Sequence, residues 1–368
     1  MGSISRLSTQ SQQNLLNNYR VYASFCGKDP TTNSNISNWI DCYDPSNNIW
    51  HRVTSIPGLM ENQVLKGFSM VSIGDFLYII GGRLCLKEPN THDPTDIFNE
   101  IDLEVLPSVL KYDIRRDIWS KCPPMNAPRF DFACTVCKNK IFVAGGQSSI
   151  GSAKGISSAE VYDPAFNEWK SLPNMSTLRY KCVGVTWLGK ILVVGGFAER
   201  GYNDSPGPYI MERSSAEAFD CQLEKWDFKA MMWTLDVPPN QIVSVNGRLF
   251  SSGDCLNAWK GHLEVYNGKL NMWDIVFGSS SDNLSSPICT ESNWSPLQRL
   301  YLTMASIGTY LYFLAGYRIP GEISRIRTEV RVFDTSANGD GWRSFEPIEE
   351  EQGEKELCCH SCVVKQDH

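Results

Sequence analysis

The sequence predicts an all-β fold, a single six-bladed β-propeller in which a C-terminal strand completes the N-terminal blade. Three observations lead to this fold class. One strand pattern recurs along the chain, each copy ends in a tryptophan, and the first copy lacks a strand while the C-terminal segment is a strand without a copy. Repeats with a period of about 20 to 50 residues are typical of solenoids and propellers, so the repeat is the strongest evidence for the fold.

The repeat consists of an apolar strand, a short turn, a second apolar strand ending in Gly-Gly, a variable stretch, and a Tyr/Phe-Asp strand before a Trp. Its clearest copies contain KIFVAGG (140–146) with AEVYDPAFNEW (159–169), and KILVVGG (190–196) with AEAFDCQLEKW (216–226). β-Branched and aromatic residues suit strands that are buried between neighbouring sheets. Paired glycines permit unusual backbone angles and close approach where the chain leaves the second strand.

Six tryptophans mark the expected blades: Trp50, Trp119, Trp169, Trp226, Trp273 and Trp342. We expect residues 1–18 to form a disordered tail and residues 19–368 to form the propeller. The expected blades are 19–64 with 357–365, 65–128, 129–178, 179–236, 237–298 and 299–356. Pairing of the last strand with the first blade closes such a ring and removes the exposed sheet edges that promote aggregation.

These motifs resemble kelch-repeat β-propellers of the galactose oxidase/kelch superfamily, and the resemblance covers about residues 19–365. The segments WIDCYDPSNNIW (39–50) and GFSMVSIGDFLYIIGG (67–82) are most similar to plant F-box/kelch proteins. An F-box requires a longer segment than the 18 residues that precede the expected first strand. The resemblance therefore implies the recognition propeller of that family without its F-box.

The composition excludes several function classes. The chain has 41 acidic and 34 basic residues, and the resulting formal net charge of −7 argues against a nucleic-acid partner. No apolar segment is long enough to span a membrane, and the N-terminal segment lacks the apolar region of a signal peptide. The 13 cysteines then indicate reduced thiols. We expect a monomer in the cytoplasm, the nucleus or both, with neither nucleic acid nor membrane as its partner.

Three arginines share one register, because Arg129, Arg179 and Arg299 each lie sixteen residues before the end of a second strand. We expect each to begin an innermost strand at the loop-rich mouth of the central channel, where binding groups concentrate. The resemblance to kelch proteins that bind acidic peptides implies that these arginines bind a carboxylate or phosphate. The alternative is that each Arg satisfies backbone carbonyls or pairs with an acid of the adjoining blade.

Further candidates are expected at the same mouth, where a few polar groups among apolar side chains suit a ligand pocket. The other expected ligand-binding residues are Tyr180, Tyr301, Arg83 and Tyr317. The candidates for acid–base catalysis are Asp131, Tyr180, Lys181, Tyr301 and His360. The alternative role of each is packing between blades.

The sequence predicts neither a cofactor nor a metal. The copper ligands of galactose oxidase and the iron motif of nitrile-specifier kelch proteins are not present in the required arrangement, and no phosphate-binding loop or dinucleotide fingerprint occurs in a suitable context. Any catalysis is therefore expected to be cofactor-independent.

The expected function is recognition of an acidic peptide segment, or of a small anionic or aromatic molecule, at the loop-rich mouth. The alternative is a cofactor-independent enzyme of specialised metabolism, a cyclase, isomerase or lyase, that uses the same central pocket. A fold alone does not decide between them. A broad, Arg-rich opening favours peptide binding, whereas a narrow aromatic pocket favours chemistry.

Overall fold

The computed structural model describes residues 18–28, 36–89, 98–152, 154–199, 213–233, 235, 237–255, 263–276, 298–319, 322–337, 341–351 and 353–366. The expected disordered tail, 1–18, lies outside these residues except for its last position. The described residues form 30 strands, and helical backbone occurs among them only at Arg213, which confirms the all-β class. Accordingly, they include no helix with the length and apolar character of a membrane span.

Six sheets share one plan, in which four antiparallel strands follow one another from a first to a fourth strand. The first sheet consists of β30 (Lys355–Lys365), β1 (Tyr19–Gly27), β2 (Trp39–Asp44) and β3 (Ile49–Ser55). The second sheet consists of β5 (Ser69–Ile73), β6 (Phe76–Ile80), β9 (Val109–Asp113) and β10 (Ile118–Cys122). The third sheet consists of β11 (Ala133–Cys137), β12 (Lys140–Ala144), β13 (Ala159–Asp163) and β14 (Glu168–Leu172).

The other three sheets follow the same plan. The fourth consists of β16 (Val183–Trp187), β17 (Lys190–Val194), β19 (Ala216–Asp220) and β20 (Lys225–Lys229). The fifth consists of β21 (Ile242–Val245), β22 (Arg248–Ser251), β23 (Glu264–Asn267) and β24 (Met272–Ile275). The sixth consists of β25 (Arg299–Ile307), β26 (Tyr310–Ile319), β27 (Glu322–Asp334) and β28 (Trp342–Ser344).

Smaller elements extend these sheets. Strand β29 (Ile348–Glu350) pairs with β27, and β15 (Leu178–Tyr180) pairs with β18 (Phe197–Glu199). A separate three-stranded sheet consists of β4 (Gln63–Lys66), β7 (Arg83–Pro89) and β8 (Phe98–Val105). The long segment after the second sheet's Gly-Gly therefore contains a hairpin, β7–β8.

Burial decreases from the second strand of a sheet to its fourth. In β12 and β17 every residue after the initial lysine is buried, whereas β14 has no fully buried residue. Four of the repeat tryptophans, Trp119, Trp169, Trp226 and Trp273, nevertheless donate a hydrogen bond from the indole N–H, whereas Trp50 Nε1 has no partner among the described residues. Trp169 Nε1 donates to the Pro123 carbonyl at 3.0 Å, and Trp226 Nε1 donates to the Pro173 carbonyl at 2.7 Å. Each tryptophan thus ties its sheet to the segment that leads into it.

The Gly-Gly pair has a steric cause. Gly145 and Gly146 have φ angles of 70° and 92°, which side chains disfavour. A Cβ atom on Gly146 would lie 2.7 Å from the Phe130 carbonyl oxygen, so the following chain can approach only a glycine.

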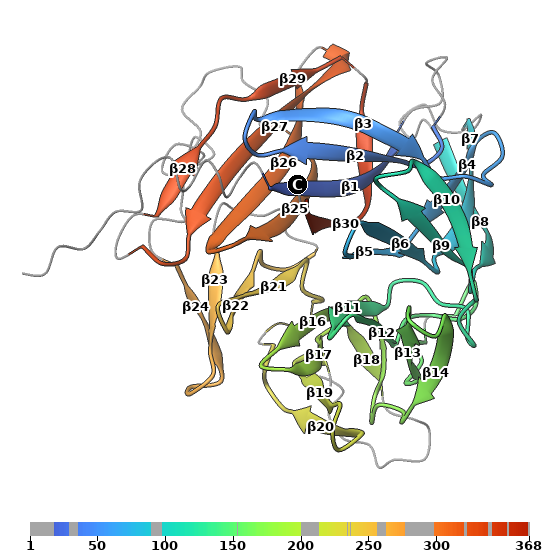
Figure 1. The fold of residues 1–368 in the computed structure, drawn as a ribbon, viewed down its shortest axis with the longest axis vertical. Coiled ribbons are helices and arrows are strands. Elements are labelled where there is room, and N and C mark those ends of the chain that lie inside the picture. Colours follow the sequence, from blue (N-terminus) through green and yellow to red (C-terminus); the bar gives the residue numbers. More distant parts are fainter. Residues whose placement is uncertain are drawn as a thin grey trace, which may run out of the picture.

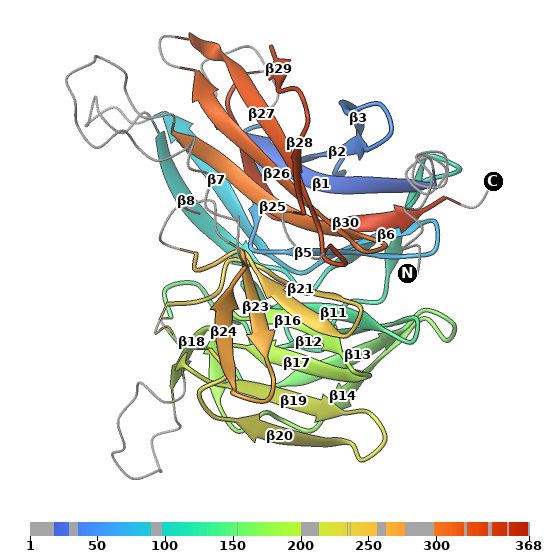
Figure 2. The same cartoon turned by 90° about the vertical axis from the view of Figure 1, so that its left-hand side faces the viewer.

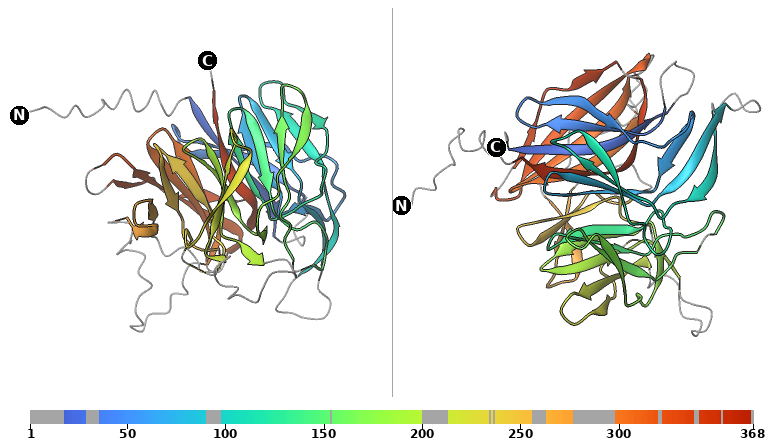
Figure 3. Two further views of the ribbon diagram at one scale, coloured as in Figure 1. Left: turned by 90° about the horizontal axis from the view of Figure 1, so that it is seen from below. Right: turned by 45° about the vertical axis from the view of Figure 1, so that its right-hand side comes forward.

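The first strands of the six sheets lie next to one another. In chain order β5, β11, β16, β21 and β25 contact their neighbours, and β30 contacts both β25 and β5. The ribbon shows the N-terminal strand β1, in blue, beside the C-terminal strand β30, in dark red (Figure 1 and Figure 2). The two views of Figure 3 show the sheets standing side by side. As expected, the last strand belongs to the N-terminal sheet, with pairs from Tyr19–Lys365 to Gly27–Lys355.

Lys355, the first residue of β30, is a buried cation between two sheets. Its Nζ lies 2.5 Å from Glu350 Oε2 and 3.2 Å from Asp41 Oδ2, and only 1% of the residue is exposed. The ammonium group also lies 4.3 Å from the centre of the Phe25 ring. Burial alone lowers the pKa of Lys355, but the nearby Tyr301, Glu350 and Asp41 raise it above its ordinary value.

The residues on either side of Lys355 are also paired. Glu354 accepts a hydrogen bond from Arg318 Nη2 at 2.7 Å and lies 3.2 Å from Lys28 Nζ. Glu356 Oε1 lies 2.9 Å from Lys87 Nζ. We call Glu354, Lys355 and Glu356, with these partners, the closing-strand charge cluster. It connects β30 to the first and sixth sheets and to the β7–β8 hairpin.

Lys355→Ala leaves two buried carboxylates without their shared cation. Removing one partner of a buried ion pair costs about 3–5 kcal/mol, so we expect the free energy of unfolding to fall by that amount in urea titrations. Lys170→Ala is the matched control, because its exposed ion pair with Glu168 contributes little, and we expect a change within about 0.5 kcal/mol. Equal unfolding midpoints for Lys355→Ala and the unmodified chain would contradict the role of the charge cluster.

Candidate functional site

A cavity of about 850 Å³ lies along the first strands of all six sheets. Its volume is within the range of small-molecule sites, which is about 300–1,000 Å³. The lining includes segments of β5, β11, β16, β21, β25 and β30, together with the residues that lead into several of them. Residues that are far apart in the sequence therefore line one cavity.

Hydroxyl groups in the lining connect neighbouring sheets. Ser72 Oγ donates to the Val363 carbonyl at 2.7 Å, and the hydroxyl oxygens of Thr303 and Ser361 are 2.9 Å apart. On another side, Gln241 donates to the Met304 carbonyl at 2.8 Å. These bonds satisfy polar groups within the lining and hold the first strands in register with one another.

Arg129 and Arg179 do not lie in this cavity. Both are 0% exposed, and their guanidinium groups point into their own sheets. Arg129 donates to the Gly145 carbonyl at 2.9 Å and to Glu160 at 2.7 Å. Arg179 makes the equivalent bonds in the fourth sheet, to the Gly195 carbonyl at 3.0 Å and to Glu217 at 3.3 Å.

The expected shared opening for three arginines is thus not found, because two of the guanidinium groups are already bonded. Arg129 and Arg179 instead bond to backbone carbonyls and to an acid, which is the alternative that the sequence left open. Each acid, however, belongs to the same sheet as its arginine and not to the adjoining one. Glu160 and Glu217 occupy one register position, two residues before the aromatic residue of the third strand. In the first sheet this position is Asp41, and its cation is Lys355. A buried cation ahead of the first strand and an acid on the third strand therefore recur in three sheets.

The sixth sheet departs from this rule. The register of β26 with β27 places Arg331 where Glu160 and Glu217 lie in their sheets. Arg299 therefore has no acid at that position, and among the described residues no hydrogen bond or ion pair reaches its guanidinium group. Its Nη1 atom is buried, and burial lowers the pKa of Arg299. Arg299 lines the cavity.

Asp131 and Lys181 also line the cavity, as expected for residues at its mouth. Both have left-handed backbones, with φ of 52°, just before the first strands of their sheets. Burial raises the pKa of Asp131, although Lys181 and Arg83 oppose the change. Within the part of the chain that the structure describes, the Lys181 ammonium group has no ion-pair partner.

Tyr301 and His360 belong to the lining as well. The Tyr301 hydroxyl is 2.8 Å from Thr328 Oγ1, which in turn donates to Glu350 at 2.7 Å. Burial lowers the pKa of His360 to about 4, so its imidazole is neutral at pH 7. Its Nδ1 atom has no hydrogen-bond partner among the described residues.

The remaining candidates lie outside the lining. Tyr180 packs against Phe197, with ring centres 5.2 Å apart. Tyr317 is 9% exposed and packs in the core of the fifth and sixth sheets. Arg83 pairs with Asp102 at 2.9 Å and lies 4.0 Å from Asp131. It contacts a residue of the lining but does not line the cavity itself.

The cavity is also lined by thiols, which were not among the candidate residues chosen from the sequence. Six cysteines contribute to the lining: Cys134, Cys182, Cys255, Cys358, Cys359 and Cys362. The signal was available, because most of them fall on or next to expected innermost strands, but their usual role as small core residues concealed it. Burial raises the pKa of Cys134 and Cys362 to about 12, which makes these thiols unreactive.

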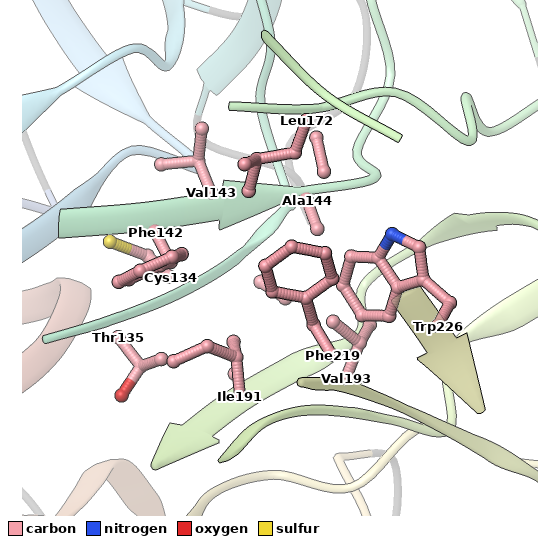
Figure 4. A pocket seen from close by; sticks show the side chains of 13 residues that line it. Cys134, Thr135, Phe142, Val143, Ala144, Leu172, Ile191, Val193, Phe219 and Trp226 are labelled. Atoms are coloured by element: carbon pink, nitrogen blue, oxygen red, sulfur yellow. The ribbon is translucent and has the colours of Figure 1, made fainter. Parts of the chain in front are cut away.

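A small void and a cluster of potential metal ligands are the two other features of note, and neither is assigned a binding role. A void of about 10 Å³ between the third and fourth sheets is lined mainly by apolar side chains, among them Phe142, Phe219 and Trp226 (Figure 4). Cys85, Glu100 and Asp102 bring potential metal ligands together. Since Arg83 already pairs with Asp102 and Lys66 with Glu100, we assign no metal there.

Comparison with known proteins identifies the repeat. The model of the Kelch motif matches residues 128–176. The F-box/kelch-repeat protein SKIP30 of Arabidopsis thaliana is 31% identical over 310 residues, which are 83% of this chain and 74% of that protein. Another F-box/kelch-repeat protein of Arabidopsis thaliana is 30% identical over 209 residues, 56% of this chain and 51% of that protein. Kelch-like protein 26 of Danio rerio is 26% identical over 291 residues, 77% of this chain and 40% of that protein. The match thus spans about half, or less, of the last two relatives.

Arg129→Ala leaves Glu160 buried without its cation and four hydrogen bonds unmade. We expect the free energy of unfolding to fall by about 3–5 kcal/mol in urea titrations, as for other broken buried ion pairs. The control is Arg115→Ala, since Arg115 is largely exposed in its pair with Asp75 and we expect a change within about 0.5 kcal/mol. An unchanged unfolding midpoint for Arg129→Ala would show that this arginine is free for a ligand after all.

Proposed function

Because this chain belongs to the kelch-repeat family, we propose that it is a recognition module whose six sheets form one closed propeller and whose central cavity binds an anionic group. The support for closure is the order of contacts among the first strands, which returns from β25 through β30 to β5. Kelch-repeat relatives such as kelch-like proteins suggest a protein-interaction module in general terms. The cations that line the cavity, Arg299 and Lys181, support an anionic ligand.

The observation that carries the proposal is that, within the described part of the chain, no acid pairs with the charge of Arg299. Three sheets neutralise the buried cation ahead of the first strand with an acid on the third strand, but the sixth sheet has Arg331 at that place. A half-buried guanidinium group without a counter-ion is costly, and an incoming carboxylate or phosphate removes the cost. Charge-assisted hydrogen bonds to such a group are among the strongest that a ligand can make.

Lys181 supplies a second cation to the same cavity, two sheets away from Arg299. The rest of the lining mixes polar groups with apolar side chains such as Phe132 and Leu302 and with several thiols. A ligand with an anionic group on an apolar body fits this arrangement. A free carboxylic acid and the acidic side chain of a bound peptide share that chemistry, and the experiment distinguishes them.

Arg299→Ala is expected to remove the anion site without unfolding the protein, because the side chain makes no bond to the described residues. The ligands are a panel of aromatic and aliphatic carboxylic acids, each paired with its primary amide, and a Glu-rich peptide paired with its Gln counterpart. Titration calorimetry should show binding of an acid but not of its amide. Arg299→Ala should weaken that binding by about 10- to 100-fold, the equivalent of a charge-assisted hydrogen bond.

The control is Arg116→Ala, which removes a charge from an exposed turn and should leave the affinity unchanged. Binding of the peptide alone identifies a protein partner, and binding of the free acids alone identifies a small molecule. Equal affinity of Arg299→Ala and the unmodified chain for every acid, with equal melting temperatures, would rule out the proposed site.

The second candidate is the enzyme, and one observation favours it. Asp131, with its raised pKa, and the neutral His360 line one cavity of ligand size. A carboxyl group that stays protonated closer to neutral pH and an uncharged imidazole can transfer protons without a cofactor, as isomerases, cyclases and lyases require. Asp131 and His360 supply the groups that such catalysis requires. Binding stays the first candidate because it requires only the cations of the cavity.

Asp131→Asn tests this candidate, because the amide keeps the shape and removes the proton transfer. If the protein is an enzyme, incubation with plant metabolite extracts followed by mass spectrometry should reveal a product that Asp131→Asn no longer forms, while the thermal shift caused by the ligand persists. Product formation at the unmodified rate by Asp131→Asn would remove Asp131 from catalysis.

A further inference from the structure

Cys26 on β1 and Cys358 on β30 meet where the two ends of the chain pair. Both belong to a small cluster with Ile36, Val64 and Cys85. Cys26 is opposite Glu356, and Cys358 is the unpaired residue at an irregularity between the Phe25–Leu357 and Ser24–Cys359 pairs. Cys358 packs against the cluster that contains Cys26, so the two thiols are neighbours at this irregularity.

A fixed cation lies against one of these thiols. Lys87 Nζ is 3.8 Å from Cys26 Sγ, and it donates to the Gly27 carbonyl at 2.8 Å and to Glu356 at 2.9 Å. Lys87 is only 3% exposed, so the ammonium group cannot move away into solvent. A buried ammonium group beside a sulfur atom stabilises the thiolate, which is the nucleophilic form.

The electrostatics separate Cys26 from the neighbouring cysteines. A hydrogen bond from Cys358 and the charge of Lys87 lower the pKa of Cys26 against the effect of burial. Burial raises the pKa of Cys42, in the same sheet, to about 12.

We propose that Cys26 and Cys358 are an oxidisable pair that reacts with hydroperoxides to form a disulfide between β1 and β30. The Cys26 thiolate attacks one oxygen of hydrogen peroxide, so that an S–O bond forms, the O–O bond breaks and hydroxide leaves. The Cys358 thiol then attacks the sulfenic sulfur, so that the S–S bond forms and water leaves with the thiol proton. Two thiols are oxidised by two electrons, and the peroxide is reduced to water and hydroxide.

The cavity gives the oxidant its path. Cys26 is 0% exposed, but Cys358 is half-buried and lines the cavity. Hydrogen peroxide is about the size of water and reaches the pair from that side. The disulfide joins the first described strand to the last, so it closes a loop that includes most of the chain. Cross-links across long loops are expected to stabilise most, when the native geometry accepts them.

The experiment uses the full chain, reduced and then exposed to hydrogen peroxide. Peptide mass spectrometry without reductant should find the Cys26 peptide linked to the Cys358 peptide, with the loss of two hydrogens, and the melting temperature should rise and return on reduction. Cys26→Ser and Cys358→Ser should each abolish the link. The matched control, Cys42→Ser, removes a buried thiol from the same sheet and should retain it.

Two further measurements identify the reactive sulfur and the role of the cation. In Cys358→Ser, a dimedone probe should trap a sulfenic acid on Cys26, and Cys26→Ser should show none on Cys358. Lys87→Met should slow the oxidation by about tenfold for each unit by which the pKa of Cys26 rises. Oxidation of Cys359 or Cys362 while Cys26 stays reduced, or a cross-link from Cys26 to Lys87 in place of Cys358, would overturn the proposal.

Discussion

The pairing of β1 with β30 is the constraint on which the rest of the structure depends. It joins the two ends of the described chain in one sheet, and it places a strand of the C-terminal segment between the second and sixth sheets. Three consecutive charged residues, Glu354 to Glu356, pair with opposite charges on several other elements, among them β2, β7 and β26, at the point where β30 begins. Because β30 also lines the central cavity, the same contacts position the proposed binding site.

The cavity shows how one change in a repeat can create a site. In the third and fourth sheets the third strand carries an acid, and the arginine ahead of the first strand forms an ion pair with it. Where Arg331 replaces the acid, Arg299 keeps its charge for the cavity. The proposed ligand chemistry therefore depends on the acid that Arg331 replaces rather than on an added residue.

Most of the fold could be predicted from the sequence, because the Gly-Gly strands, the aromatic-Asp strands and the tryptophans each have a local cause that the structure confirms. The site could be predicted only in part. Spacing along the chain placed Arg129, Arg179 and Arg299 ahead of their first strands, but it could not show the direction of each side chain, which depends on an acid about thirty residues later. Asp131, Lys181, Tyr301 and His360 line the cavity as expected, but Tyr180, which also lies just before a first strand, does not, so position along the chain alone does not decide which side chains reach the cavity.

In the pairs of Arg129 with Glu160 and of Arg179 with Glu217, the buried charges of each sheet's arginine and acid cancel within that sheet. A repeat with an internal counter-ion can be duplicated without adding an uncompensated charge to the interior of the molecule. When such a chain gains a whole repeat, the buried arginine and the acid that neutralises it are added together. Diversification then requires only the loss of one acid, after which a buried cation is available for new chemistry.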